Sequence, residues 1–129
     1  MLTKNEKSLF CKIFVNTNLA HGELIAKTAS LTHGVIEQWT IVCNLYEISV
    51  VENDEYDEIK YQDKDEGFLF SKFFLEIEPI ATLTNKTTYI SDISKLLEGL
   101  WQEGYSAVAA CDFEDLLPNK GGYRIKNLA

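Results

Sequence analysis

The sequence predicts an α+β fold, an α/β sandwich with one mainly antiparallel sheet and two helices on one face. Three observations lead to this prediction. Candidate elements follow one another as strand, helix, strand, strand, helix, strand; the 129 residues suit a single domain spanning 1–129; and apolar residues make up 46% of the chain. This element order is that of the ferredoxin-like split βαβ arrangement.

The first half of the chain predicts a strand, a helix and a long second strand. Residues 9–15 have high β-propensity, and residues 20–31 place apolar side chains on one helical face, with Asn18 as a possible cap. From residue 36 to residue 51 apolar and polar side chains alternate at close to period two. We therefore expect one strand over 36–51, with a bulge near Asn44.

The second half predicts a partner strand, a second helix and a last strand. Residues 68–77 are expected to pair antiparallel with 36–51 across a long acidic loop, and 107–111 is a continuous apolar run typical of a covered strand. Ser91 or Asp92 can cap the second helix. Its buried face is predicted from apolar residues at the spacing i, i+3, i+4, i+7, i+8: Ile93, Leu96, Leu97, Leu100 and Trp101.

The charge of the chain limits the classes of partner. The net charge is −8, so nucleic acid and anionic membranes are repelled and a basic protein is attracted. No apolar run approaches the ~20 residues that span a bilayer, and no secretory signal pattern is found at the N-terminus. We expect a cytoplasmic protein that binds neither nucleic acid nor membrane.

Catalytic and metal-binding patterns are missing from the sequence. Cys11, Cys43 and Cys111 form no CxxC pair, and His21 and His33 have no metal-binding spacing. No GxSxG, HExxH or P-loop motif is found. We expect three reduced thiols, no cofactor, no metal and no enzymatic activity.

Acidic residues concentrate in two segments, which are the candidate partner-binding sites. The loop over residues 52–66 contributes −6 to the net charge, but its spacing fails the EF-hand pattern. It is interpreted either as a solvated loop that maintains solubility or as a docking surface for a basic partner. The second segment follows the last strand and serves as a cap or as a contact surface. The candidates are Glu52, Asp54, Glu55, Asp57, Glu58, Asp63, Asp65, Glu66, Asp112, Glu114 and Asp115.

Three stretches of the chain resemble a known class of protein. These are NDEYDE at residues 53–58, DEGFLFSKFFLEIEP at 65–79, and SDISKLLEGLWQEGYSAVAACDFEDLLPNKGGY at 91–123. Together they resemble small acidic bacterial immunity proteins of contact-dependent growth inhibition and other polymorphic toxin systems. The resemblance implies a cytosolic protein that binds and neutralises a cognate toxin C-terminal domain, many of which are basic nucleases.

Two other functions remain open at the level of the sequence. One is a ferredoxin-like domain that binds a small molecule through a few polar side chains, for which the candidates are Tyr46, Tyr56, Tyr61, His21 and His33. The other is a structural adaptor subunit without inhibitory activity.

Overall fold

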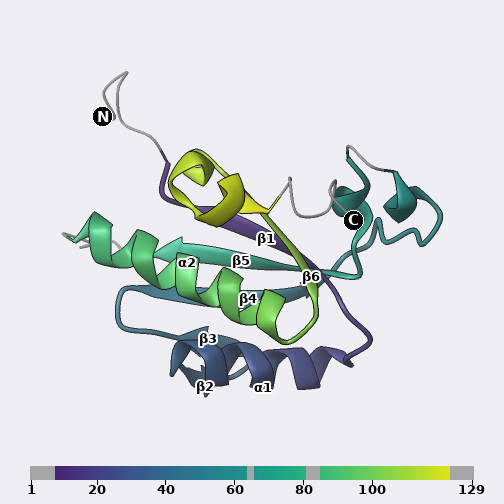
Figure 1. Cartoon of the computed structure of the whole chain (residues 1–129). Coiled ribbons are helices and arrows are strands. Elements are labelled where there is room, and N and C mark those ends of the chain that lie inside the picture. The colour runs from purple at the N-terminus through teal and green to yellow at the C-terminus, as the bar shows by residue number, and fades with distance from the viewer. Residues whose placement is uncertain (1–7, 64–65, 81–84, 123–129) are drawn as a thin grey trace.

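A computed structural model shows one antiparallel sheet with two helices packed against it, and describes residues 8–63, 66–80 and 85–122 (Figure 1). The sheet has six strands in the order β2-β3-β4-β5-β1-β6. This architecture confirms the predicted α+β class. The elements are β1 Cys11–Asn16, α1 His21–Thr32, β2 Val35–Glu37, β3 Thr40–Val42, β4 Tyr46–Glu52, β5 Phe73–Pro79, α2 Lys86–Gln102 and β6 Ser106–Cys111.

The six-strand order differs from the four-stranded ferredoxin-like sheet that the sequence predicts. The predicted single strand over 36–51 is wrong, because the chain reverses twice and forms β2, β3 and β4 in its place. At the first reversal Gln38 has φ 52° and Trp39 has φ 85°. Left-handed residues at both turn positions are typical of a tight two-residue hairpin, which usually carries Asn-Gly. Each reversal shifts the alternation by one residue, since Ile36, Ile41 and Ile48 share one face of the sheet. The two shifts cancel, so the apolar positions before the first reversal and after the second fit a single strand.

The main core lies between the sheet and the two helices. Its backbone register aligns one row of side chains across all six strands: Ile36, Ile41, Ile48, Ile77, Cys11 and Cys111. From the helices, Leu24 and Ile25 of α1 and Ile93 and Leu97 of α2 pack onto this face. The predicted apolar face of the second helix is confirmed, since Ile93, Leu96, Leu97 and Leu100 are buried and Trp101 is half-buried.

Both helix caps differ from the predicted residues. Helix α1 begins after Ala20, whose backbone N–H donates to the Glu23 carboxylate at 2.8 Å, so Asn18 is not the cap. Helix α2 begins nearly two turns earlier than expected. Its cap is Asn85, whose side-chain oxygen accepts from the Thr88 N–H at 3.0 Å. Ser91 and Asp92 therefore lie inside the helix.

The second face of the sheet is covered at one end by the segment that precedes β5. Residues Gly67–Phe70 form a 3-10 turn, η2, so the predicted strand 68–77 begins only at Phe73. Phe68 packs edge-to-face on Phe14 of β1, with ring centroids 5.4 Å apart. Phe14, Phe68 and Val108 form a second small core. The aromatic contact explains the turn, because Phe68 must leave the plane of the sheet to cover Phe14.

The two edges of the sheet are treated differently. At the β6 edge, Trp101 Nε1 donates to the Ala107 carbonyl at 2.9 Å, and residues 121–122 pass so close that a Cβ on Gly121 would meet the Ala109 carbonyl at 2.7 Å. At the β2 edge, within the described part of the chain, the strand backbone is hydrogen-bonded to β3 alone. One edge is covered and the other is open.

We expect Leu100→Ala to lower the free energy of unfolding by about 2–5 kcal/mol, because Leu100 is fully buried and its loss leaves a cavity under α2. Chemical denaturation measures this change. Glu98→Ala on the exposed side of the same helix is the control, with an expected change within about 0.5 kcal/mol. Equal effects of the two substitutions would show that this face does not form the core.

We expect Trp39→Gly to raise the free energy of unfolding by about 1 kcal/mol. Glycine adopts the left-handed conformation without steric cost, and the tryptophan side chain is 75% exposed, so few contacts are lost. Thermal or chemical denaturation measures the change. A loss of stability would mean that the Trp39 side chain contributes packing that its exposure does not reveal.

Candidate functional site

The acidic loop between β4 and β5 is held in place by one asparagine. The Asn53 side-chain amide donates to the carbonyls of Leu69 and Ser71 at 3.0 and 2.8 Å. Its oxygen accepts from the Glu55 N–H at 3.0 Å. These bonds fasten the start of the loop to the η2 turn that covers Phe14. The described part of the loop is therefore fixed against the η2 turn.

Two of the predicted contact residues are structural parts of this loop. Asp57 accepts from the backbone N–H groups of Ile59 and Lys60, both at 2.9 Å, and Asp63 accepts from the Glu66 N–H at 3.0 Å. Such carboxylates close local turns. Their charges remain, but the lone pairs used in these bonds are not available to a partner.

Three other predicted acids line a groove that we call the acid-rimmed groove. Asp54 and Glu55 are exposed at its rim, whereas Glu52 pairs with Phe73 and so directs its side chain to the helix face of the sheet. The volume of the groove is about 440 Å³, and it lies between the loop and the second face of the sheet. The carboxylates of Glu52, Asp54 and Glu55 make no hydrogen bond or ion pair with the described residues. Apolar side chains line the rest of the groove: Phe14, Val51, Leu69, Phe70 and Phe74.

A lysine of the chain already lies on the aromatic floor of this groove. The Lys12 ammonium is 4.1 Å from the centroid of the Phe74 ring and 5.6 Å from that of Phe14. A cation over an aromatic face is attracted by the quadrupole of the ring. The groove therefore has the chemistry that accepts a lysine or arginine side chain: an aromatic floor and a carboxylate rim.

The loop also exposes apolar side chains beside its acids. Ile59 is 84% exposed and Tyr56 is 40% exposed. An isoleucine exposed in this way on an ordered turn does not increase the solubility of the protein. Apolar anchors surrounded by charge are typical of protein-binding surfaces.

The remaining predicted contact residues are scattered. Glu58 and Glu66 are exposed on the loop, whereas Asp65 lies outside the described residues. Beyond β6, Asp112 accepts from the Ser8 N–H at 3.1 Å, Glu114 accepts from the Cys111 N–H at 3.3 Å, and Asp115 is exposed.

The two acidic segments lie at opposite ends of the strands. Glu52 pairs with Phe73 and so lies in the row of Val15 and Ala107. Asp112 directly follows Cys111, and Cys111 is four residues further along β6 than Ala107. This corresponds to about 13 Å along the strand direction. The structure does not combine the two segments into one site.

Sequence reasoning missed a group of glutamates on the second face of the sheet. Glu47 and Glu78 are direct cross-strand partners, both exposed, and Glu37 and Glu76 lie on the same face in the next row. Like charges directly opposite each other destabilise a sheet. A signal was present in the sequence: residues 28–59 contain seven acidic residues and no lysine or arginine. Only the strand register shows which of them share a face.

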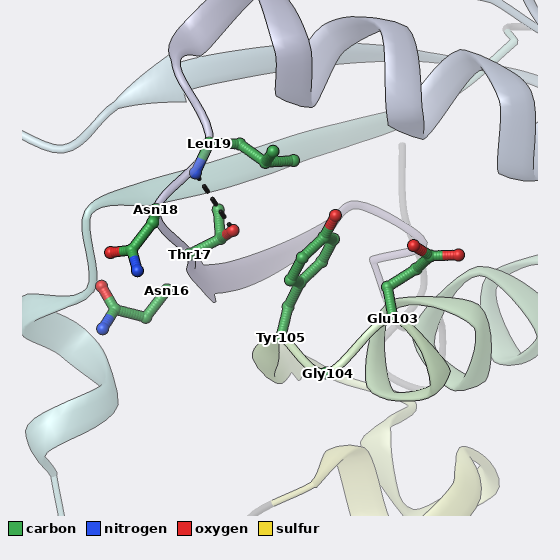
Figure 2. A pocket seen from close by; sticks show the side chains of 7 residues that line it. All are labelled: Asn16, Thr17, Asn18, Leu19, Glu103, Gly104 and Tyr105. Atoms are coloured by element: carbon green, nitrogen blue, oxygen red, sulfur yellow. Dashed lines mark hydrogen bonds between the residues drawn. The ribbon is translucent and has the colours of Figure 1, made fainter.

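A polar hollow of about 480 Å³ lies between the β1–α1 connection and the α2–β6 turn (Figure 2). Most of its polar side chains are engaged in hydrogen bonds or an ion pair within the protein. The Asn16 side chain accepts from the Lys72 N–H at 2.9 Å, Thr17 accepts from the Leu19 N–H at 3.3 Å, and Glu103 pairs with Lys27 at 3.1 Å. It has few apolar walls for a small molecule.

The candidates for small-molecule binding are not gathered around one cavity. His21 Nε2 lies 2.7 Å from the Val50 carbonyl, Tyr46 packs against Tyr89, and Tyr56 is on the acidic loop. His33 and Tyr46 share one hollow with Cys43 and Asp92, but burial raises the pKa of the Cys43 thiol, which disfavours its nucleophilic thiolate.

The described part of the chain contains neither a metal-binding cluster nor a membrane-spanning helix. Within residues 8–63, 66–80 and 85–122, no three His, Cys, Asp or Glu side chains are grouped so as to hold a metal ion. Over the same residues, no helix has the length and apolar character needed to cross a membrane.

Comparisons of the chain with protein-family models, with curated proteins and with solved structures find no match.

Two of the three thiols form a cross-strand pair. Cys11 of β1 is opposite Cys111 of β6 in the register, and Cys11 is fully buried whereas Cys111 is half-buried. A hydrogen bond from the Cys11 thiol to the Cys111 sulfur holds the pKa of Cys111 below its ordinary value. The same bond, together with burial, raises the pKa of Cys11.

We expect Cys111 to react with iodoacetamide near neutral pH faster than Cys11 and Cys43, because its thiolate forms at lower pH. Cys11→Ala removes the hydrogen bond, so the midpoint of the pH–rate profile for Cys111 should move to higher pH. Mass spectrometry of alkylated peptides measures both rates. Cys11→Ser retains a donor and is the control; a profile unchanged in Cys11→Ala would exclude the bond as the cause.

Proposed function

We propose that this protein is a cytosolic immunity protein that binds and neutralises the toxic domain of a basic partner protein. The observation that carries the proposal is the acid-rimmed groove. Asp54 and Glu55 make no hydrogen bond or ion pair with the described residues, and they stand beside an aromatic floor that already holds the Lys12 ammonium. A lysine or arginine of the partner would find carboxylates there, beside the Lys12 ammonium that already covers the Phe74 ring.

Three further features support a protein partner over a small ligand. Ile59 and Tyr56 offer apolar contacts beside the groove. On the same face of the sheet, Glu47 and Glu78 lie two rows from the groove residues Val51 and Phe74 and add negative charge. A net charge of −8 attracts a basic domain over long range. The resemblance of the sequence to immunity proteins agrees with this combination.

We also propose that the fold is a ferredoxin-like split βαβ unit enlarged by the β2–β3 hairpin. β5 lies between β1 and β4, and β1 lies between β5 and β6, with every neighbouring pair antiparallel. On this interpretation the hairpin is an insertion between α1 and β4. It would extend an otherwise four-stranded sheet at one edge.

Co-expression with the C-terminal domain of the large protein encoded directly upstream tests the function. The resemblance to immunity proteins leads us to expect that this domain inhibits growth alone, that growth recovers when both proteins are made, and that the two purify together. A toxic upstream domain whose effect continues in the presence of this protein would contradict the proposal.

The role of the groove is tested by the double variant Asp54→Asn with Glu55→Gln. We expect association with the basic domain to slow by about tenfold at low salt, since two steering charges are lost. Stopped-flow or surface-based kinetics measures the rate. The difference should diminish toward 1 M salt, where the Debye length falls to about 3 Å.

The matched control is Glu98→Gln with Asp92→Asn, which removes the same charge from two positions of helix α2 that do not line the groove. We expect its association rate to stay within about twofold of the unmodified protein at low salt. Equal slowing by both variants would assign the effect to net charge and not to the groove.

A further inference from the structure

The open edge of the sheet exposes apolar side chains on both of its faces, outside the acid-rimmed groove. Strand β2 exposes Val35 to 61% and Ile36 to 47%, and the turn that follows exposes Trp39 to 75%. Three large apolar side chains thus lie within five consecutive residues. Tryptophan is the side chain most often found as an energetic anchor of protein interfaces.

The backbone beside these side chains is also unoccupied. β2 is the outermost strand, and in the described part of the chain it is bonded to β3 alone. At the other edge of the sheet, by contrast, Trp101 and residues 121–122 cover the backbone of β6. An edge that is open, apolar and flanked by a tryptophan is suited to receive a further strand.

The charge around β2 determines what kind of strand fits. Glu37 lies on the second face of the sheet in one row with Thr40, Ser49 and Glu76, while Glu47 and Glu78 lie in the next row. The chain has no lysine or arginine between residues 28 and 59. A second copy would therefore bring another cation-free edge to this one. A strand with basic side chains on that face would place them beside Glu37.

We propose that the β2 edge binds an extended basic segment of the partner protein, which adds a strand to the sheet and packs against Trp39. This inference rests on the proposed function and adds to it a second contact at the opposite side of the sheet from β6. Main-chain hydrogen bonds to β2 supply affinity, and alternate basic side chains facing Glu37 supply selectivity. The left-handed Trp39 is kept at the turn because it anchors that segment.

The test uses the ¹⁵N-labelled full chain and an eight-residue peptide that alternates lysine and valine. We expect chemical-shift changes at the amides of Val35, Ile36 and Glu37 and at the Trp39 indole, together with slower amide exchange in β2. The same peptide with glutamate in place of lysine is the control and should leave these signals unchanged. Salt should weaken the binding of the lysine peptide.

Two variants separate anchoring from folding. Trp39→Gly should weaken peptide binding about tenfold or more while the protein remains at least as stable, because glycine suits the turn. Leu116→Ala removes an equally exposed apolar side chain, 67% exposed, from a position beyond β6 and should leave binding unchanged. Equal binding by Trp39→Gly and the unmodified chain would overturn the role of Trp39.

The remaining outcomes separate this inference from the proposed function. Shifts confined to residues 52–55 would overturn the edge as the docking site and leave the groove intact. Concentration-dependent shifts in β2 without peptide, with a dimer in sedimentation, would assign the edge to a second copy and overturn the proposal. Binding of the peptide at β2 by a protein that does not rescue growth would support the edge and contradict the immunity function.

Discussion

The Phe14 side chain requires cover on the face of the sheet that the helices do not reach. β1 is an inner strand, with Cys11, Ile13 and Val15 facing the helices, so Phe14 points to the other side. Phe68 meets that need from the η2 turn. Because Asn53 ties the loop to η2 through Leu69 and Ser71, the acidic segment is ordered by the same contact. The groove, its rim and the exposed Ile59 all follow from burying one phenylalanine.

The second face of the sheet has two chemically different parts. Near Phe14 the second face of the sheet is aromatic and covered, whereas toward β2 it is open and carries glutamates at alternate positions. The cross-strand pair Glu47 and Glu78 opposes the stability of the sheet. Charges that oppose folding are compatible with a role in binding, because a basic partner relieves their repulsion. A binding role thus gives a single reason for the groove rim, the glutamate face and the open edge.

Some carboxylates of this protein accept hydrogen bonds from the backbone, whereas others face solvent. Glu23 caps α1, and Asp57 and Asp63 close turns of the loop. Glu52, Asp54 and Glu55 have no such role in the described residues. Amino-acid composition does not distinguish these two groups of carboxylates. Substitution of a turn-closing aspartate would alter the conformation of the loop as well as its charge. The hydrogen bonds show which acids can be changed without disturbing the fold.

The sequence by itself determined the elements whose side chains repeat with a clear period. The spacing of apolar residues is a local property of the sequence, and it indicates which side chains become buried. It accounts for the face of α2 from Ile93 to Leu100, for the short strand at 106–111 and for the helix at 21–32. Only the tertiary structure decided the hairpin at Gln38 and Trp39, the turn at Gly67–Phe70 and the grouping of Glu37, Glu47, Glu76 and Glu78. These depend on strand register and on contacts such as Phe14 with Phe68, which join residues more than fifty positions apart in the chain. The two reversals between β2 and β4 each shift the side-chain alternation by one residue, and the shifts cancel, so the period-two pattern at residues 36 and 46–50 did not reveal them.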